Sequence, residues 1–471
     1  RRFYDLVIEI ALIRPGPMQG GAVHPYLRRR RKQEAPDPPH PALGEVLGRT
    51  LGVPLFQEQL MQMAMTVGGC NAEDADLLRR SMGSKRGVER IGSLKGKLMA
   101  GMRENGIPDD QAERIYAQIE SFADFGFAES HSLSFALLVY ASSWLKLHYP
   151  AAFLAGLLRS QPMGFYSPRT LVEDARRHGV VVHPADVQHP TVEAELERLT
   201  DHPRPSGLSA CLEHEQPPVP PFRRDAPDDS ARHRRDAAFA VRLGLAGVRG
   251  IDRATAARIA AARDSGPFID LPDLARRADL DRHRLEALSA AGACAGLGTG
   301  RRESLWAAAP AEANRERYLP GVSVHVQPPL LPVLTEAERT ALDLWTTGVL
   351  SGLHPMALLR ERLERRGVIR SDRLREAPPG TRVVVAGLVT HRQRPATAGG
   401  VTFVTLEDEA GSTNIVTWAD VWARHRPIAR GAPALLVAGA LERSREGVLN
   451  VIAESFEALE APAAVSSRDF Q

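Results

Sequence analysis

The spacing of apolar residues changes along this chain, and that change limits the possible folds more than any single motif does. From Gln57 to Leu158, apolar side chains recur at helical spacing, as at Leu60 and Ala64. From Arg382 onward, short β-rich runs follow one another instead. A chain of 471 residues is long enough for roughly three domains with cores of their own. The sequence therefore predicts a multidomain α+β protein, helical first and β-rich last.

Two stretches between these parts lack a clear period. Residues 188–236 combine a Pro-rich piece at 216–221 with mixed charges, which is typical of a linker or mobile loop. Residues 313–380 have Pro-rich joints and one amphipathic helix, and they read as a connector. The predicted organisation is a helical region at 1–187, a linker at 188–236, helical hairpins at 237–312, a connector at 313–380, a β-domain at 381–460 and a tail at 461–471.

The β-domain has the pattern of a small OB-fold β-barrel, because five β-rich runs enclose a short helix between the third and the fourth. The segment from His391 to Pro395 is expected to be the loop between the first two strands, where OB folds commonly bind single strands. Arg392 and Arg394 are therefore candidate DNA contacts. Phe403 and Trp418 either stack on a base or belong to the core, and the sequence leaves both open.

Leu243 to Ile251 resembles a helix-hairpin-helix motif. In such a turn, the backbone N–H groups around Gly247, Arg249 and Gly250 can bind DNA phosphates without reading the base sequence. Gly-rich helical turns also occur in proteins that do not bind DNA, so the motif predicts a DNA-binding domain only together with its neighbours.

Overall composition restricts the function less. The formal net charge of +3 is too small to require a nucleic-acid partner. The three cysteines are far apart and favour neither a disulfide framework nor a zinc site, which fits a reducing cytoplasm. The apolar stretch from Leu133 to Leu158 is interrupted by Lys146 and Pro150, so it predicts two buried helices and no membrane partner.

Clusters of cations in the helical region are candidate phosphate contacts. The run from Arg28 to Lys32, with Arg29 and Arg30, is either a DNA-attracting surface or a solvated segment. Arg79 and Arg80 end a predicted helix before Lys85, where cations also simply stabilise a helix C-terminus. Arg14 precedes a stiff Pro-Gly-Pro turn that can hold its guanidinium toward a phosphate.

Three motifs together resemble the fingers region of bacterial C-family DNA polymerases, the family of the replicative polymerase III alpha subunit. They are Arg14-Pro-Gly-Pro17, the run Phe125 to Ser132, and Gln161 to Pro168, of which the last is similar to the error-prone branch. Ser130-His131-Ser132 is read as the start of a finger helix, because no nucleophile elbow surrounds it.

The resemblance implies specific partners. Arg14 would contact the triphosphate of the incoming nucleotide, and Arg79, Arg80 and Lys85 would face its phosphates. Primer–template DNA and deoxynucleoside triphosphates would be the substrates. A sliding clamp and accessory damage-tolerance proteins are further implied partners.

The acids that polymerase chemistry needs are not evident. Two Mg²⁺ ions about 3.5–4 Å apart require paired carboxylates, which the family supplies from a Pro-Asp-x-Asp strand and a third aspartate. Asp74 and Asp76 lie on one helix but face different directions, and the acids at 407–409 close a strand. We expect the Mg²⁺ ligands upstream of Arg1, so that this chain holds no catalytic or metal residue.

The resemblance thus implies the fingers, helix-hairpin-helix and OB-fold portion of an error-prone DNA polymerase that would act in damage-induced mutagenesis and translesion synthesis. Two alternatives stay open. A fragment of the replicative alpha subunit is disfavoured by Gln161 to Pro168. A non-catalytic DNA-binding scaffold explains residues 240–460 but not the first two motifs.

Overall fold

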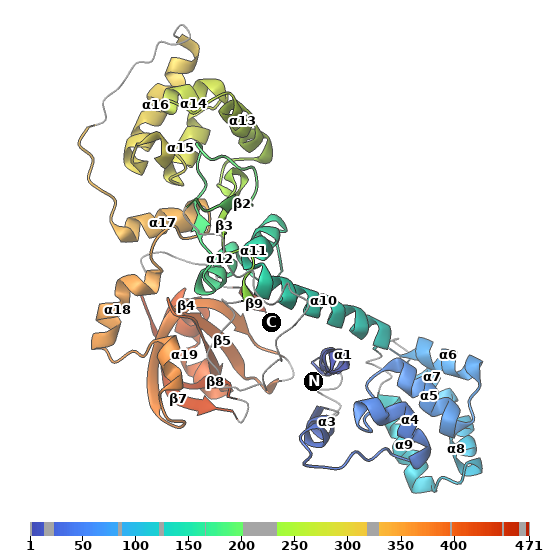
Figure 1. The fold of residues 1–471 in the computed structure, drawn as a ribbon. Coiled ribbons are helices and arrows are strands. Elements are labelled where there is room, and N and C mark those ends of the chain that lie inside the picture. Colours follow the sequence, from blue (N-terminus) through green and yellow to red (C-terminus); the bar gives the residue numbers. More distant parts are fainter. Residues whose placement is uncertain are drawn as a thin grey trace. The chain divides into compact units, whose positions relative to one another are not determined.

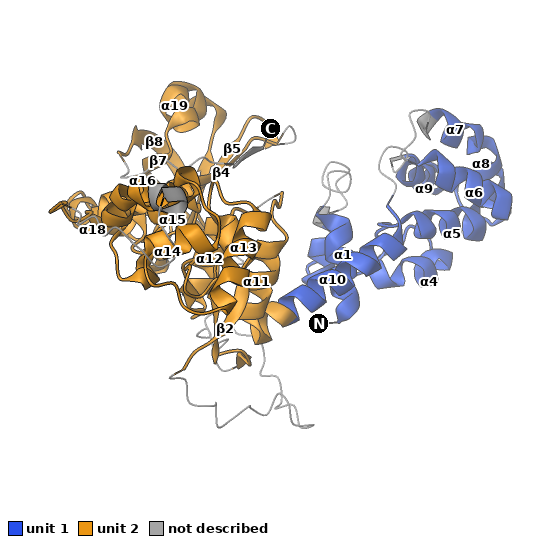
Figure 2. Ribbon diagram, turned by 90° about the horizontal axis from the view of Figure 1, so that it is seen from above, with its two compact units in different colours: residues 1–144 blue, residues 145–471 orange. Residues whose placement is uncertain are grey.

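The computed structural model describes residues 2–13, 23–82, 87–121, 127–164, 166–200, 233–317, 329–395, 398–444, 447–460 and 468–470. The chain divides into two compact units, residues 1–144 and 145–471, which Figure 2 colours separately. The first is helical, and the second combines helices with two sheets. The predicted multidomain α+β class is therefore confirmed.

The first unit is held together by a core in which α5 is central. Leu60, Met63, Ala64 and Val67 of α5 are all buried there, at the helical spacing that the sequence predicted. The elements of this unit are α1 (Phe3–Leu12), α3 (Val23–Arg30), η1 (Pro41–Leu43), α4 (Gly44–Leu47), η2 (Gly48–Thr50), α5 (Gln57–Gly68), α6 (Ala72–Ser81), α7 (Gly87–Ser93), α8 (Lys95–Glu104), α9 (Asp109–Ser121) and α10 (Glu129–His148), whose last turn belongs to the second unit (Figure 1).

Polar contacts attach the start of α10 to two other helices of the first unit. The buried hydroxyl of Ser132 donates to the carbonyl of Val7 at 2.6 Å, and the N–H of Glu129 donates to Glu58 at 2.9 Å. The Tyr4 hydroxyl donates to Glu129, and burial followed by this carboxylate raises the pKa of Tyr4. Ser132 thus serves in packing, and the prediction of a helix start is confirmed.

The apolar surface of α10 is largely exposed, which corrects part of the expectation. Two helices, α10 and α11 (Pro150–Arg159), do occupy the stretch from 133 to 158. However, Leu137 and Leu138 are each 60% exposed, while Ala136 is fully buried. Within the described part of the chain, no helix combines the length and the apolar character needed to cross a bilayer.

A small sheet opens the second unit and revises the expected linker. Strand β1 (Val182–His183) pairs in parallel with β3 (Phe239–Arg242), which also pairs with the antiparallel β2 (Glu195–Arg198). Strand β2 lies inside the stretch 188–236 that was expected to be irregular, whereas the Pro-rich piece at 216–221 lies outside the described residues. The pairing partner of β2 comes much later in the sequence, so the local composition did not indicate a strand.

The predicted helical hairpins are present and begin at regular caps. Asp252, Asp270 and Asp281 each accept a hydrogen bond from the backbone N–H three residues later. Their apolar faces share one core. The elements are η4 (Leu245–Gly247), α13 (Arg253–Asp264), α14 (Leu271–Arg277), α15 (Arg282–Ala290), η5 (Ala295–Leu297) and α16 (Arg301–Arg317).

Five strand pairings, four antiparallel and one parallel, close the predicted barrel. Strand β4 pairs with both β5 and β7, so the order β5-β6-β8-β7-β4 returns to β5. Helix α19 (Ala419–Gly431) lies between the third and fourth strands, as predicted. The strands are β4 (Arg382–Gln393), β5 (Thr402–Glu407), β6 (Ser412–Thr417), β7 (Ala434–Arg443) and β8 (Leu449–Ala458), with a short β9 (Arg468–Phe470) beside β4.

A buried ion pair joins the barrel to helix α12 (Pro168–Arg177). Nη1 of Arg169 lies 3.0 Å from a carboxylate oxygen of Glu407 at the end of β5, and the two side chains are 4% and 1% exposed. Arg177 reaches the other oxygen at 3.4 Å. The connector, residues 313–380, lies between the helical hairpins and the barrel in the sequence. It contains α17 (Glu336–Thr346), α18 (Pro355–Arg365) and η6 (Ser371–Arg375).

Candidate nucleic-acid interface

The three described arginines of the basic run on α3 all have carboxylate partners. Arg28 and Arg29 share Glu34, at 2.8 and 3.2 Å, and hydrogen bonds from both hold the pKa of Glu34 below its usual value. Arg30 lies 2.6 Å from an acid on α1. Arg29 also donates to the carbonyl of Leu51 and is 12% exposed. Arg28 and Arg30 are about half exposed and can turn toward DNA, whereas Arg29 has a structural role.

The two adjacent arginines of α6 share a single carboxylate. Arg79 and Arg80 lie 2.8 and 2.7 Å from the two oxygens of Asp76, and the hydrogen bond from Arg79 is the main cause of the lowered pKa of this acid. Arg80 is 70% exposed. Two cations against one anion leave a net positive charge, and exposed ion pairs contribute little because solvent screens them. A phosphate can therefore replace Asp76 at little cost.

Of the four expected nucleotide contacts, the structure describes Arg79 and Arg80, which meet at Asp76. Arg14 and Lys85 lie outside the described residues. Figure 1 draws α3 and α6 on different sides of the first unit. The arginines of these two helices therefore form two separate positive surfaces.

The hairpin turn presents fewer free N–H groups than its sequence indicated. The N–H groups of Gly247, Val248 and Ile251 donate within the turn, and that of Arg249 donates to the carbonyl of Thr346 at 2.8 Å. Among the five N–H groups of residues 247–251, all of them described, only that of Gly250 has no protein acceptor in the described part of the chain. Of the phosphate contacts predicted in this turn, the exposed Gly250 N–H and the exposed Arg249 side chain therefore remain available.

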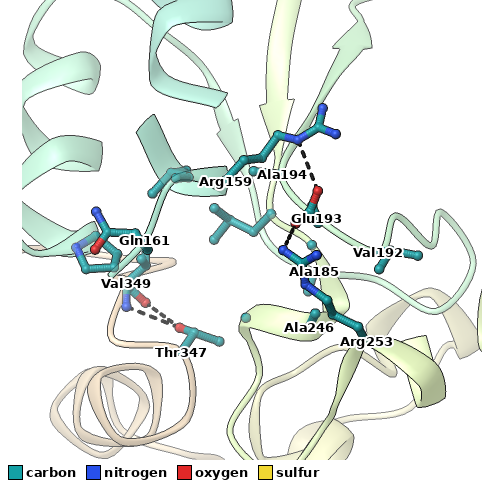
Figure 3. A pocket seen from close by; sticks show the side chains of 15 residues that line it. Arg159, Gln161, Ala185, Val192, Glu193, Ala194, Ala246, Arg253, Thr347 and Val349 are labelled. Carbon is teal, nitrogen blue, oxygen red and sulfur yellow. Dashed lines mark hydrogen bonds and ion pairs between the residues drawn. The ribbon is translucent and has the colours of Figure 1, made fainter. Parts of the chain in front are cut away.

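A cavity of about 270 Å³ lies beside this turn (Figure 3). Arg159 from the end of α11 and Arg253 from the start of α13 both pair with Glu193. Gly244 forms part of the wall, where a Cβ atom would overlap the backbone of Glu193. Two arginines against one acid leave an excess positive charge at the cavity, next to the hairpin.

Exposed aromatic and basic side chains lie at one end of the barrel. Phe403 is 40% exposed and pairs in register with Gln393, directly before Arg394, which is exposed too. Trp418, directly after β6, is 54% exposed. A Cβ atom on Gly400 would contact both the residue after Trp418 and the Arg394 guanidinium. Neither aromatic belongs to the barrel core, so this surface suits stacking with a single strand.

Arg392 requires a correction. Residues 391–393 belong to strand β4 and not to the following loop, and Arg392 is 6% exposed. Its guanidinium donates to the carbonyls of Ala429 and Ala432 at the end of α19. Arg392 thus satisfies a helix C-terminus inside the barrel domain, and a strand on the surface cannot reach it in this arrangement.

Comparisons with known proteins agree with this order of domains. The family model of the bacterial DNA polymerase III alpha subunit finger domain matches residues 1–106. The model of the helix-hairpin-helix motif matches residues 179–304, and the model of the OB-fold nucleic acid binding domain matches residues 383–459. The whole chain is 54% identical to the error-prone DNA polymerase of Cutibacterium acnes, and it covers 42% of that protein. Along its full length, the chain is therefore similar to error-prone DNA polymerases. It also matches the error-prone polymerases of Nocardia farcinica, at 49% identity and 39% of that protein, and of Mycobacterium bovis, at 48% and 40%.

The chain spans about two fifths of the length of these curated relatives. The matches confirm the resemblance to the error-prone branch and the presence of finger, helix-hairpin-helix and OB domains. A solved asparaginyl-tRNA synthetase from Pyrococcus horikoshii aligns with 20% of the chain at 20% identity and a TM-score of 0.18, which is too low for an argument.

DNA polymerases use divalent metal ions, but the described acids of this chain do not fit such a site. The Asp74 carboxylate accepts from the N–H of the N-cap Asn71 and pairs with Lys97, Asp76 is held by two arginines, and Glu407 is buried against Arg169. Across the described segments, no three His, Cys, Asp or Glu side chains come together as metal ligands would. We derive no catalytic step from these residues.

Trp345 of α17 is a surface residue that the sequence did not single out. It is 58% exposed, and its ring lies beside the hairpin turn. The sequence does indicate the helix that carries it, since Thr335 and Glu338 form a capping box. This cap places the tryptophan in the last turn of α17. Its proximity to Arg249 depends on tertiary packing alone.

Proposed function

We propose that this chain supplies nucleotide grip and DNA binding to an error-prone DNA polymerase. The whole enzyme would carry out template-directed nucleotidyl transfer in the cytoplasm, in damage-induced mutagenesis and translesion synthesis, with primer–template DNA and deoxynucleoside triphosphates as substrates. The observation that carries the proposal is a match to error-prone polymerases along the full chain, with finger, hairpin and OB domains in one order.

The division of labour follows from the side chains. The α6 arginines would exchange Asp76 for the triphosphate, with Arg14 and Lys85 as further proposed contacts. Arg28 and Arg30 would attract template or primer phosphates. The hairpin would hold DNA through Gly250 and Arg249, and the barrel would hold a single strand through Arg394, Phe403 and Trp418. The Mg²⁺ ligands would come from the rest of the enzyme.

Primer extension by the purified 471 residues tests the catalytic part of the proposal. With Mg²⁺, all four deoxynucleotides and a primed template, we expect no extension, because the described acids are engaged elsewhere. Extension that depends on Mg²⁺ would show that the chain carries its own metal site.

Nucleotide binding separates the polymerase from a non-catalytic scaffold. Arg80→Ala should weaken binding of a deoxynucleoside triphosphate by about tenfold or more, since a hydrogen bond to a charged group contributes about 1.5–3 kcal/mol. Arg103→Ala is the matched control, because Arg103 is also an exposed arginine in a carboxylate pair, on α8. Equal affinities for both variants and the unaltered chain would favour the scaffold.

Protein partners form the last part of the proposal. A sliding clamp and accessory damage-tolerance proteins would assemble with the whole enzyme. Co-elution of the 471-residue chain with a bacterial sliding clamp in gel filtration would assign clamp binding to this part, and separate elution would assign it elsewhere.

A further inference from the structure

Trp345 and Arg249 form a stacked pair at the hairpin turn. The guanidinium carbon of Arg249 lies 5.4 Å from the centre of the Trp345 ring. The Arg249 N–H donates to Thr346, the residue after the tryptophan, so the backbone ties the two segments together at the same point. The tryptophan therefore belongs structurally to the hairpin, although it lies outside the residues that match the helix-hairpin-helix motif.

The tryptophan sits on a rigid support. The buried Asp343 of α17 accepts hydrogen bonds from Arg301 at 2.6 Å and from the N–H and hydroxyl of Ser351, both at 2.6 Å. At the other end of the helix, Arg302 pairs with Glu338 at 2.8 Å. These contacts fix α17 against α16, so the indole is held in place before any ligand arrives and loses little freedom on binding.

The pair lines an open hollow of about 710 Å³. One wall is the turn from Ala246 to Arg249, and the other is the end of α17 with Ala341, Leu344 and Trp345. No carboxylate of the described residues lies within ion-pair distance of Arg249, unlike Arg253, which pairs with Glu193. The hollow thus offers an aromatic face and a cation that is not neutralised by an acid in the described part of the chain.

We propose that this hollow binds one nucleotide unit of a single DNA strand, with the base stacked on Trp345 and the phosphate on Arg249. An arginine stacked on an aromatic ring keeps its in-plane N–H groups available for phosphate oxygens. An exposed indole stacks on any base, because every base has a π-face. The inference rests on the proposed DNA-binding function and adds a single-strand contact to a motif otherwise suited to duplex backbones.

Titration of the full chain with oligo(dT) and with a blunt duplex tests this site. Trp345→Ala should lower the affinity for oligo(dT) by about tenfold, from the loss of one stacked base, and change duplex affinity less. Trp345→Phe should keep most of the affinity but remove part of the tryptophan fluorescence quenching. Arg249→Ala should reduce the slope of log K against log salt by about 0.7, as expected for one single-strand phosphate contact.

The matched control is Trp306→Ala on α16, an exposed tryptophan of the same hairpin region at 39% exposure. It should leave oligo(dT) affinity unchanged. If the chain binds DNA but both Trp345 variants keep full affinity and quenching, the single-strand site is refuted while the proposed function stands. If duplex and oligo(dT) affinities fall equally, Trp345 only positions Arg249, and the stacking is refuted. If the unaltered chain binds no DNA, the proposed function itself fails.

Discussion

Replacing Arg169 by methionine should destabilise the barrel strongly. Arg169 is 4% exposed and pairs with Glu407, which is 1% exposed. Burial raises the pKa of the Glu407 carboxyl even though Arg169 and then Arg177 act in the opposite direction. The carboxylate therefore depends on its arginines, and methionine fills a similar space without supplying a charge.

The magnitude follows from the remaining contacts. Breaking a buried pair by removing one partner costs about 3–5 kcal/mol. Arg177 remains 3.4 Å from Glu407 and is 28% exposed, so the lower end, about 3 kcal/mol, is expected. For a domain of the size of the barrel, residues 381–460, about 3 kcal/mol lowers the midpoint of thermal unfolding by about 12–24 °C.

Differential scanning calorimetry is suitable because the units can unfold in separate transitions. Only the transition that includes the barrel should move, and Arg103→Met, in an exposed pair of the first unit, should move no transition by more than about 1–2 °C.

A double substitution tests the physical reason. Arg169→Met with Glu407→Leu should recover most of the loss, because apolar replacement of a whole buried pair is often neutral. Such recovery gives a strongly non-additive cycle. A loss below about 1 kcal/mol for Arg169→Met, or simple additivity in the cycle, would refute the reasoning.

Three further outcomes are expected. Hydrogen bonds from Arg242, more than from His183, lower the pKa of Glu197 to about 2. The ionised carboxylate therefore stabilises the fold above its usual pKa, and this stabilisation is lost as the pH falls toward 2. Glu197→Gln should destabilise the chain at pH 7 in urea titrations, and the difference from the unaltered chain should shrink at low pH. On α10, Ala136→Glu should lower the free energy of unfolding by about 3 kcal/mol or more, because the site is fully buried. Leu138→Glu, at a site that is 60% exposed, should change it by no more than about 0.5 kcal/mol in the same titration. Similar losses for the two variants would show that α10 is oriented differently. Gly244→Ala should cost about 1–3 kcal/mol by overlap with the Glu193 backbone, whereas Gly247→Ala meets nothing within 4 Å; equal melting temperatures would contradict this packing.

Local patterns were sufficient to predict most of the elements. Aspartates at helix starts, such as Asp252 and Asp281, act within three residues, so their sequence position predicts the cap. The barrel strands follow from short β-rich runs in the sequence. Strand β2 could not be predicted in this way, because its pairing partner β3 is distant in the sequence.

The sequence could not predict which arginines face solvent. Arg392 and Arg394 are two positions apart and looked equivalent, but one is buried against the end of α19 and the other is exposed. The N–H of Arg249 is taken by Thr346, nearly a hundred residues away, while its side chain stacks on Trp345. The sequence by itself determined the resemblance to error-prone polymerases, the order of domains and most helices and strands, since these depend on neighbouring residues. Only the tertiary structure decided which polar groups remain available to DNA. Whether a donor or acceptor already has a hydrogen-bond partner depends on which distant segments pack against it.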